Sequence, residues 1–371
     1  RHWYVPHIFI CFSANLSEAA FFVYIIKVTL NAGRDNIMLV VCGSATSWIL
    51  SNLSRNRGGL YGRLTCEIKL SPFNLKECED YFKNENIEMS RYDIVQSYMV
   101  FGGIPYYLSY FKKGMSFEGN ADNILFGKNP RLKDEFNRLF NAIFSNPEDC
   151  KKIIRLLAKK HVGFTREEIA KETGLPFGGG LTDTLNALVE SDFIQRYRPY
   201  NVSGKVSFYK LIDNFSLFWL KYVEPNTEDI NFMTDNMTSN IMRVWRGVAF
   251  EEVCWQHIGQ IKRALGISGV SSSISAWSVK GNDNKEGVQI DLLIIRNDKV
   301  VNLCEMKFAG DIYSIDKEED AKIRNRIQTL INTLSPKQSV HLTMITTYGV
   351  SHTMYGGRVQ QQVILDDLFL S

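Results

Sequence analysis

The stretch that most constrains the fold is VQIDLLIIRNDKVVNLCEMKF, residues 288–308. Two runs rich in aliphatic and β-branched residues flank the polar segment Arg296 to Lys299. Such runs on either side of a short polar turn are typical of a β-hairpin. The sequence therefore predicts two paired strands with acidic and basic residues among their apolar ones.

The register of this hairpin decides which side chains meet. Side chains alternate across a strand, so Glu305 and Lys307 share one face, and Cys304, Met306 and Phe308 share the other. A loop of even length would pair Asp291 with Cys304, away from Glu305. A three-residue loop at 297–299, or a bulge, would place Asp291 opposite Glu305. We predict the second register.

In that register two carboxylates lie within roughly 5 Å of each other, with a lysine one pleat further along. Acidic groups this close repel unless they share a proton or a cation, and carboxylate plus water suits Mg²⁺ or Mn²⁺. Lys307 could then support an attacking hydroxide or the charge that develops on a phosphate. The alternative is a solvated hairpin edge with surface ion pairs. The apolar runs favour a site, because burying unpaired charges costs several kcal/mol.

The spacing Asp291, Glu305, Lys307 resembles the PD-(D/E)XK nuclease superfamily, although Ile290 stands where the name-giving proline would be. The resemblance implies a metal-dependent DNA nuclease with Asp291 and Glu305 as metal ligands and all three residues as catalytic. It also implies that an acid on the preceding helix, expected over 243–265, completes the metal site. Glu251 is the matching position, and its alternative is an exposed helix carboxylate.

A second organised region, residues 149–212, reads as three short helices and a two-stranded ribbon. Thr165 and Glu168 have capping-box spacing at the start of its second helix. This order is typical of a winged helix-turn-helix, which often contacts DNA. The third helix holds no Arg or Lys, so we expect phosphate contacts rather than base reading, or a role in binding protein. The candidate DNA-binding residues are Lys159, Lys160, Arg166, Arg196 and Lys205.

From about residue 35 the chain resembles the bacterial and archaeal family of AAA-type ATPases that carry a winged helix and a C-terminal PD-(D/E)XK nuclease-like domain. NIMLVVCGSATSWI reads as a buried parallel strand that ends in a polar turn. The resemblance implies weak nucleotide-sensing candidates at Ser44, or its neighbour Thr46, and at Arg63. Their alternatives are a strand-end cap and a structural ion pair.

Both nucleotide-binding motifs of that family are missing. The sequence contains no G-x-x-x-x-G-K-[ST] loop, and no apolar strand ending in Asp-Glu precedes residue 35. Gly127-Lys128 lacks the flanking glycine and hydroxyl of a phosphate loop. ATP is therefore expected in full-length relatives but not here. A gene fragment, a late start or a frameshift would explain the unusual first 33 residues, which we expect to pack poorly or to supply a replacement edge strand.

The predicted fold class is a multidomain α/β protein. The expected order is a truncated AAA-type α/β core at 1–85, a helical lid at 86–148, the winged helix at 149–212, a connecting helical segment at 213–240 and the restriction-endonuclease-like α/β domain at 241–371. A chain of 371 residues is long enough for several cores.

Composition excludes several classes of protein. The seven cysteines show no zinc or CxxC spacing and most lie in apolar runs, so we expect reduced core residues of a cytoplasmic protein. No apolar run reaches the roughly 18 to 20 residues that span a bilayer, so no membrane partner is expected. The net charge of +3 identifies no partner by itself.

Two functions remain open from the sequence. The first is a magnesium-dependent DNA endonuclease whose other domains position the substrate. The second is a catalytically silent remnant of an ATP-binding ATPase that binds DNA or a protein partner, with self-assembly a further option. The intact acid/acid/lysine set favours the first function, and the missing phosphate loop favours the second.

Overall fold

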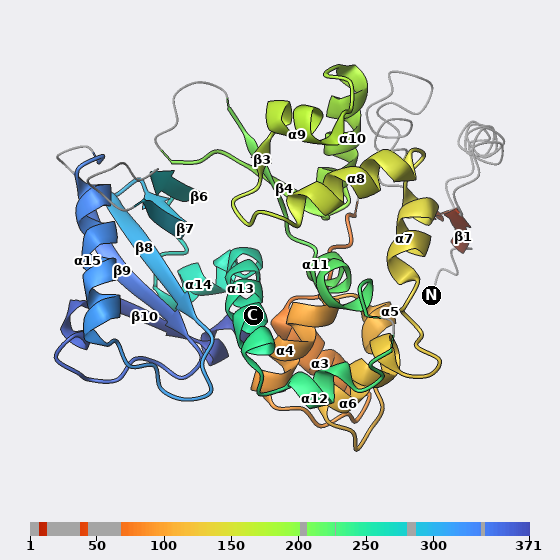
Figure 1. Cartoon of the computed structure of the whole chain (residues 1–371), viewed down its shortest axis with the longest axis horizontal. Helices are drawn as coiled ribbons and strands as arrows, with labels where there is room; N and C mark the ends of the chain where they lie inside the picture. The colour runs from red at the N-terminus through yellow and green to blue at the C-terminus, as the bar shows by residue number, and fades with distance from the viewer. Residues whose placement is uncertain are drawn as a thin grey trace, which may run out of the picture. The chain divides into compact units, whose positions relative to one another are not determined.

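The computed structural model describes residues 7–12, 38–43, 68–200, 206–226, 228–279, 287–334 and 338–371. The fold is a mixed α/β one (Figure 1). The chain divides into two compact units. The first comprises residues 1–71, 134–156 and 169–194, and the second comprises 72–133, 157–168 and 195–371.

The first unit contains a short parallel sheet and several helices. Strands β1 (His7–Phe12) and β2 (Met38–Gly43) pair in parallel, so the strand expected within NIMLVVCGSATSWI is confirmed. Helix α7 (Glu135–Ile143) buries Phe136 and Phe140. The Phe140 ring lies 4.8 Å from that of Phe193. Aromatic rings at this separation add to the stability that burial provides.

The region expected to form a winged helix has the predicted elements in the predicted order. Its helices are α8 (Pro147–Leu157), α9 (Arg166–Thr173) and α10 (Gly179–Glu190). Strands β3 (Phe164–Thr165), β5 (Phe208–Leu211) and β4 (Ile194–Tyr197) form a sheet in that order. The capping box is confirmed, because Glu168 N donates to Thr165 Oγ1 at 3.2 Å and Thr165 N donates to Glu168 Oε2 at 2.7 Å.

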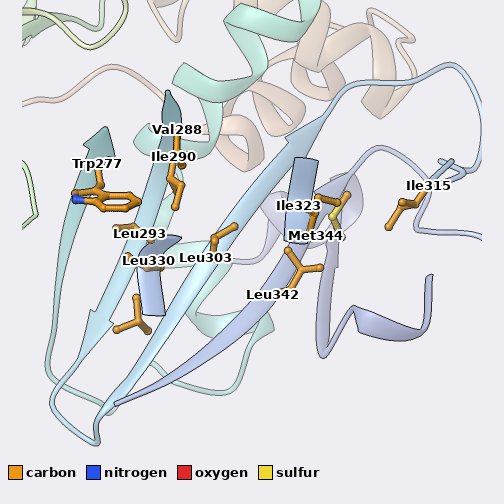
Figure 2. Close-up of a cluster of buried hydrophobic side chains, with 11 residues drawn as sticks. Trp277, Val288, Ile290, Leu293, Leu303, Ile315, Ile323, Leu330, Leu342 and Met344 are labelled. Atoms are coloured by element: carbon orange, nitrogen blue, oxygen red, sulfur yellow. The ribbon is translucent and has the colours of Figure 1, made fainter. Parts of the chain in front are cut away.

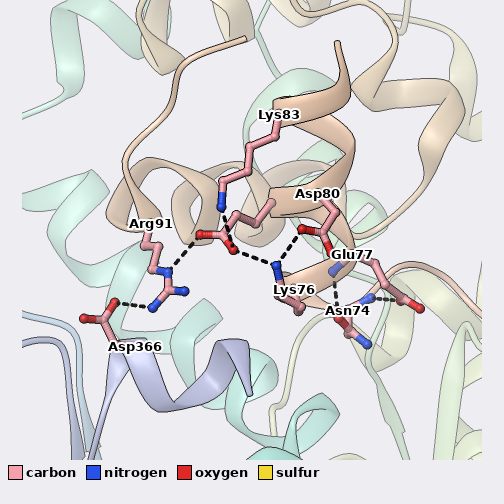
Figure 3. Close-up of polar contacts among 8 residues, drawn as sticks. Asn74, Lys76, Glu77, Asp80, Lys83, Arg91 and Asp366 are labelled. Atoms are coloured by element: carbon pink, nitrogen blue, oxygen red, sulfur yellow. Dashed lines mark hydrogen bonds and ion pairs between the residues drawn. The ribbon is translucent and has the colours of Figure 1, made fainter. Parts of the chain in front are cut away.

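The second unit begins with helices that pack against its C-terminal end. Helix α3 (Leu75–Asn84) has a capping box made by Asn74 and Glu77. Glu79 of α3 accepts bonds from Lys76, Lys83 and Arg91 (Figure 3). Arg91 begins α4 (Arg91–Phe101) and also contacts Asp366, in the terminal 3-10 helix η5 (Leu365–Phe369). This network of charges joins α3, α4 and η5.

Short helical segments complete the helical part of this unit. They bury mostly aromatic and aliphatic side chains, such as Phe218 and Trp245. In order they are α5 (Pro105–Leu108), α6 (Phe117–Ala121), the π-helical turn η2 (Asp122–Phe126), α11 (Asn214–Phe218), the π-helical turn η3 (Trp219–Val223), α12 (Phe232–Asn236), α13 (Asn240–Gln256) and α14 (Ile258–Ala264).

A five-stranded mixed sheet forms the other half of the second unit. Its order is β10-β9-β8-β7-β6. The strands are β6 (Ser272–Val279), β7 (Val288–Arg296), β8 (Val300–Lys307), β9 (Ser339–Thr346) and β10 (Gln361–Ile364). Strands β6, β7 and β8 pair antiparallel, whereas β8, β9 and β10 pair in parallel. Helix α15 (Lys317–Ile331) connects the parallel strands β8 and β9.

Two helices cover opposite faces of this sheet. Ile323 and Leu330 of α15 join Leu293 of β7 and Leu303 of β8 in one buried cluster (Figure 2). Helix α13 packs on the other face, where Phe250 lies 5.4 Å from Phe308 between ring centroids. Residues Val301 to Met306 of β8 are all buried. The expectation that the hairpin's apolar runs are buried on both sides is thus confirmed.

No helix among the residues described combines the length and the apolar character needed to cross a bilayer.

Candidate functional site

The hairpin of β7 and β8 has the predicted register. Leu292 pairs with Cys304 and Ile295 with Val301, which leaves a three-residue loop at 297–299. Lys299 adopts a left-handed conformation with φ 68°, as expected for the last residue of such a loop. One further step along this register places Asp291 opposite Glu305.

A β-bulge changes where the Asp291 side chain lies. On the β6 side, Ser275 pairs with Leu293 but Trp277 pairs with Ile290, so β7 has one extra residue between these pairs. Ile290 and Leu293 consequently both join the core cluster beside α15. Asp291 accepts a hydrogen bond from Gln289 Nε2 at 2.6 Å instead. The bulge interrupts the alternation of side chains at this point, so the single face expected for Asp291, Glu305 and Lys307 stays a prediction.

The strands separate at this same point. Pairing between β7 and β8 ends at Leu292 and Cys304, while β8 continues to Lys307 beside β9. Beyond the last pair, Asp291 and Glu305 stand on strands that are no longer bonded to each other. Their charges still interact, because Asp291 contributes to the raised pKa of Glu305. The two acids thus lie close enough to interact at the end of the hairpin.

Glu251 lies on the Asp291 side of the hairpin. It projects from α13, and both acids line one pocket. The other residues of this pocket come from six chain segments: His161, Val162, Tyr197, Lys210, Glu252, Trp255, Ala276, Trp277, Gln289 and Ile290. Burial, and then the charge of Asp291, raise the pKa of Glu251 to about 8. The helix position inferred from the resemblance is therefore next to Asp291, in a partly desolvated pocket.

Glu305 is paired with a residue that the sequence did not identify. Arg326 of α15 lies 3.0 Å from Glu305 Oε1 and donates to Oε2 at 3.1 Å. Burial raises the pKa of Glu305 to about 7, even though Arg326 and Lys307 act in the opposite direction. Glu305 is 8% exposed, and a buried carboxylate needs such a partner.

Lys307 also contacts α15. Its Nζ lies 2.8 Å from Glu319 Oε1. Burial would lower the pKa of the ammonium group, but the bond to Glu319 outweighs burial and the pKa is raised. Lys307 is therefore a fixed positive charge at neutral pH.

Three carboxylates thus surround the end of the hairpin, with Arg326 and Lys307 as their cations. Within the part of the chain that the structure describes, no three His, Cys, Asp or Glu side chains converge closely enough to hold a metal ion. Burial is the main cause of the raised pKa values of Glu251 and Glu305, and the charge of Asp291 adds to both. Oxygen donors of one sign in a desolvated site are the donor set that Mg²⁺ or Mn²⁺ binds.

A buried ion pair beside this pocket was missed from the sequence. Lys210 of β5 lies 2.7 Å from Glu252 of α13, and both side chains are almost completely buried. The Lys210 ammonium also stands 4.5 Å from the centre of the Trp255 ring. The Glu-Glu doublet in α13 was a possible signal, since only one of two adjacent helix residues can face the hairpin.

The candidate DNA-binding residues differ in exposure. Lys159, Lys160 and Arg196 are exposed, and Arg166 is half-buried. Arg196 Nε donates to Ser207 Oγ at 3.2 Å. Lys205, Ser44, Thr46 and Arg63 lie outside the described residues, so their expected roles stay predictions.

Cys78, Cys150, Cys254 and Cys304 are free and buried. Burial raises the pKa of the Cys150 thiol to about 12, and the charge of Asp149 adds to this effect. For these four residues the expectation of reduced core cysteines is confirmed. Cys11, Cys42 and Cys66 lie in segments whose side chains are not described.

No protein-family model matches the chain. An uncharacterized protein of Methanocaldococcus jannaschii is 27% identical over 287 residues, which cover 76% of this chain and 62% of that protein. The chain therefore spans less than two thirds of that relative's length.

Two solved structures match part of the chain. A Walker-type ATPase of Pyrococcus abyssi matches with a TM-score of 0.39 and 18% identity, over 53% of this chain and 57% of that chain. Restriction endonuclease FokI matches with a TM-score of 0.21 and 11% identity, over 61% of this chain and 44% of that chain.

Proposed function

We propose that this chain is a metal-dependent DNA nuclease whose reaction site is the separated end of the β7–β8 hairpin. The observation that carries the proposal is that Asp291 and Glu251 line one pocket, where burial and then the charge of Asp291 raise the pKa of Glu251, and that Asp291 also contributes to the raised pKa of the buried Glu305. Lys307, two residues after Glu305 on β8, supplies a fixed positive charge. Buried acids that repel one another are common at functional sites, because a bound ligand supplies the compensating positive charge.

Asp291, Glu251 and Glu305 do not converge closely enough to hold an ion as they stand, so they would have to move together around it, with Mg²⁺ or Mn²⁺ as the matching cations. When bound, such an ion activates water and neutralises charge on a phosphodiester. Glu305 would exchange its contact with Arg326 for the ion. Arg326 would then be free to move toward the substrate phosphate.

The role of Lys307 follows from its protonation. Because its pKa is raised by Glu319, the ammonium group does not accept a proton at neutral pH. It would instead stabilise negative charge as it develops on the phosphate.

The other parts of the chain would position DNA through its phosphates. Lys159, Lys160 and Arg196 are exposed cations in the winged-helix region, and phosphate contacts carry most of the affinity for DNA. Binding to a protein partner, self-assembly and a cytoplasmic location are further parts of the proposal. ATP hydrolysis by this chain is not, since its sequence has no phosphate loop.

One observation favours a second candidate, a catalytically silent protein that binds DNA or another protein. Glu305 and Lys307 each already have an ion-pair partner on α15. If these pairs are permanent, α15 closes the site and the hairpin serves as a structural support only.

The deciding experiment is cleavage of supercoiled, linear and single-stranded DNA with Mg²⁺ or Mn²⁺. Asp291→Asn and Lys307→Gln should abolish cleavage. The matched control is Asp298→Asn, which removes an exposed acid in the turn of the same hairpin and should cleave like the wild type. Absence of cleavage on every substrate, together with no metal binding by calorimetry, would refute the nuclease proposal in favour of the silent one.

A further inference from the structure

A second cluster of charges lies on the helix that pairs with the candidate site. Asp320 in the first turn of α15 is 3% exposed. It binds two arginines: Arg324 Nη2 is 3.0 Å from its Oδ2, and Arg358 Nε is 2.9 Å from its Oδ1. Each carboxylate oxygen thus holds one guanidinium group.

The two arginines leave a surplus of positive charge at the surface. Their side chains are 52% and 51% exposed, whereas Asp320 beneath them is buried. One carboxylate balances one guanidinium, so the cluster carries one positive charge more than it needs. A guanidinium has five N–H donors, and within the described residues Asp320 is the recorded acceptor for both.

The chain brings these arginines together from distant positions. Arg324 is one helical turn beyond Asp320, whereas Arg358 comes from the 3-10 helix η4 (Gly356–Arg358). The turn into η4 is tight, since a Cβ on Gly356 would lie 2.8 Å from the carbonyl oxygen of Ser351. A buried carboxylate requires a partner, but Arg324 alone could supply it. The second arginine is therefore extra to the needs of Asp320.

This cluster adjoins the candidate site. Asp320 follows directly after Glu319, the partner of Lys307. Arg324 is two positions before Arg326, the partner of Glu305, on the same helix. The two arginines therefore belong to, or are bound to, the helix that carries the ion-pair partners of Glu305 and Lys307.

We propose that Arg324 and Arg358 together bind a DNA phosphate that flanks the cleaved bond. The choice of DNA as ligand rests on the proposed function. Guanidinium groups match phosphate oxygens in geometry as well as charge. Asp320 fixes both groups in place before the phosphate arrives. Such a contact sets the position of the strand and carries no sequence preference.

The test is the affinity for a short fluorescein-labelled DNA duplex, measured by anisotropy in EDTA over a range of salt concentrations. The double variant Arg324→Gln/Arg358→Gln should bind about tenfold more weakly. The slope of log affinity against log salt should fall by about 0.9 for the lost phosphate contact. The matched control is Lys322→Gln, which removes a half-exposed cation of the same helix that pairs with Glu318 and should leave the slope unchanged.

Removing both arginines leaves the buried Asp320 without a cation and could unfold this region, so a second variant is needed that keeps a cation there. Arg358→Lys keeps a cation for Asp320 but lacks the forked donor, and it should still weaken binding by several-fold. Circular dichroism checks that each variant is folded. Binding by the double variant that equals wild type or Lys322→Gln would overturn the inference, as would a wild type that does not bind DNA.

The inference and the nuclease proposal fail separately. If the wild type cleaves DNA but its affinity for DNA does not depend on the two arginines, the nuclease proposal stands and the phosphate contact is refuted. If the wild type binds DNA through the two arginines but does not cleave it, the phosphate contact stands and the nuclease proposal is refuted.

Discussion

Glu79 provides the sharpest test of the charge network that joins α3, α4 and η5 (Figure 3). Replacement by glutamine keeps the shape of the side chain and removes its charge. The carboxylate is 6% exposed, and three cations surround it: Lys76 and Lys83 at 3.1 Å and Arg91 at 2.9 Å. The variant Glu79→Gln should therefore unfold more easily than the wild type.

The size of the effect follows from the pKa of Glu79. Burial alone would raise this pKa, but the bonds from Arg91, Lys76 and Lys83 lower it from 4.5 to about 2. At 1.36 kcal/mol for each pKa unit, the cations stabilise the folded state by at most about 3.4 kcal/mol. Lys83 and Arg91 are 65% and 39% exposed, so solvent screens them. We expect Glu79→Gln to lower the free energy of unfolding by about 2 kcal/mol.

The pH dependence has a definite sign. A carboxylate whose folded-state pKa is lowered stabilises the protein above its unfolded pKa. That contribution is lost as pH falls from about 4.5 toward 2. The difference in the free energy of unfolding between wild type and Glu79→Gln should therefore be largest at pH 7 and should decrease in acid.

Urea denaturation followed by tryptophan fluorescence measures this difference. The tryptophans of the described residues report on the same unit as Glu79; they are Trp219, Trp245, Trp255 and Trp277. Asp80→Asn is the matched control, since Asp80 is 52% exposed and pairs with Lys76 alone. Asp80→Asn should lower the free energy of unfolding by about 0.5 kcal/mol. A Glu79→Gln effect no larger than that of Asp80→Asn, or one that does not change with pH, would refute the reasoning.

Three further predictions concern buried polar groups. Burial lowers the pKa of His257 to about 4, so wild-type stability should fall as pH drops from 6.5 to 4; His257→Gln should lose that dependence in acid denaturation. Lys210→Met leaves Glu252 buried without a cation and should cost about 3 to 5 kcal/mol by urea denaturation, and Lys210→Met/Glu252→Leu should recover most of it. Arg326→Gln frees Glu305 and should tighten Mn²⁺ binding several-fold by calorimetry; unchanged or weaker binding would contradict the proposed exchange.

The sequence predicted what local patterns determine. The turn residues and the flanking runs were enough for the hairpin register, because loop length sets the pairing. The capping box of Thr165 and Glu168 was equally local. The bulge at Asp291 was not predictable in this way, since it depends on pairing with β6, which lies earlier in the chain.

The partners of the candidate site residues were missed for the same reason. The face of α15 toward β8 carries Glu319 and Arg326. The rotation of α15 is fixed by Ile323 and Leu330 in the core cluster. Periodicity identified a helix there without fixing which polar residues approach Glu305 and Lys307.

The central claim is that Asp291, Glu251 and Glu305 gather around one divalent cation. Anomalous diffraction from crystals grown with Mn²⁺ tests it most directly. The nuclease proposal predicts a strong peak among these three carboxylates, with Arg326 displaced from Glu305. A map with no peak there, and with the Arg326–Glu305 pair intact, would contradict it.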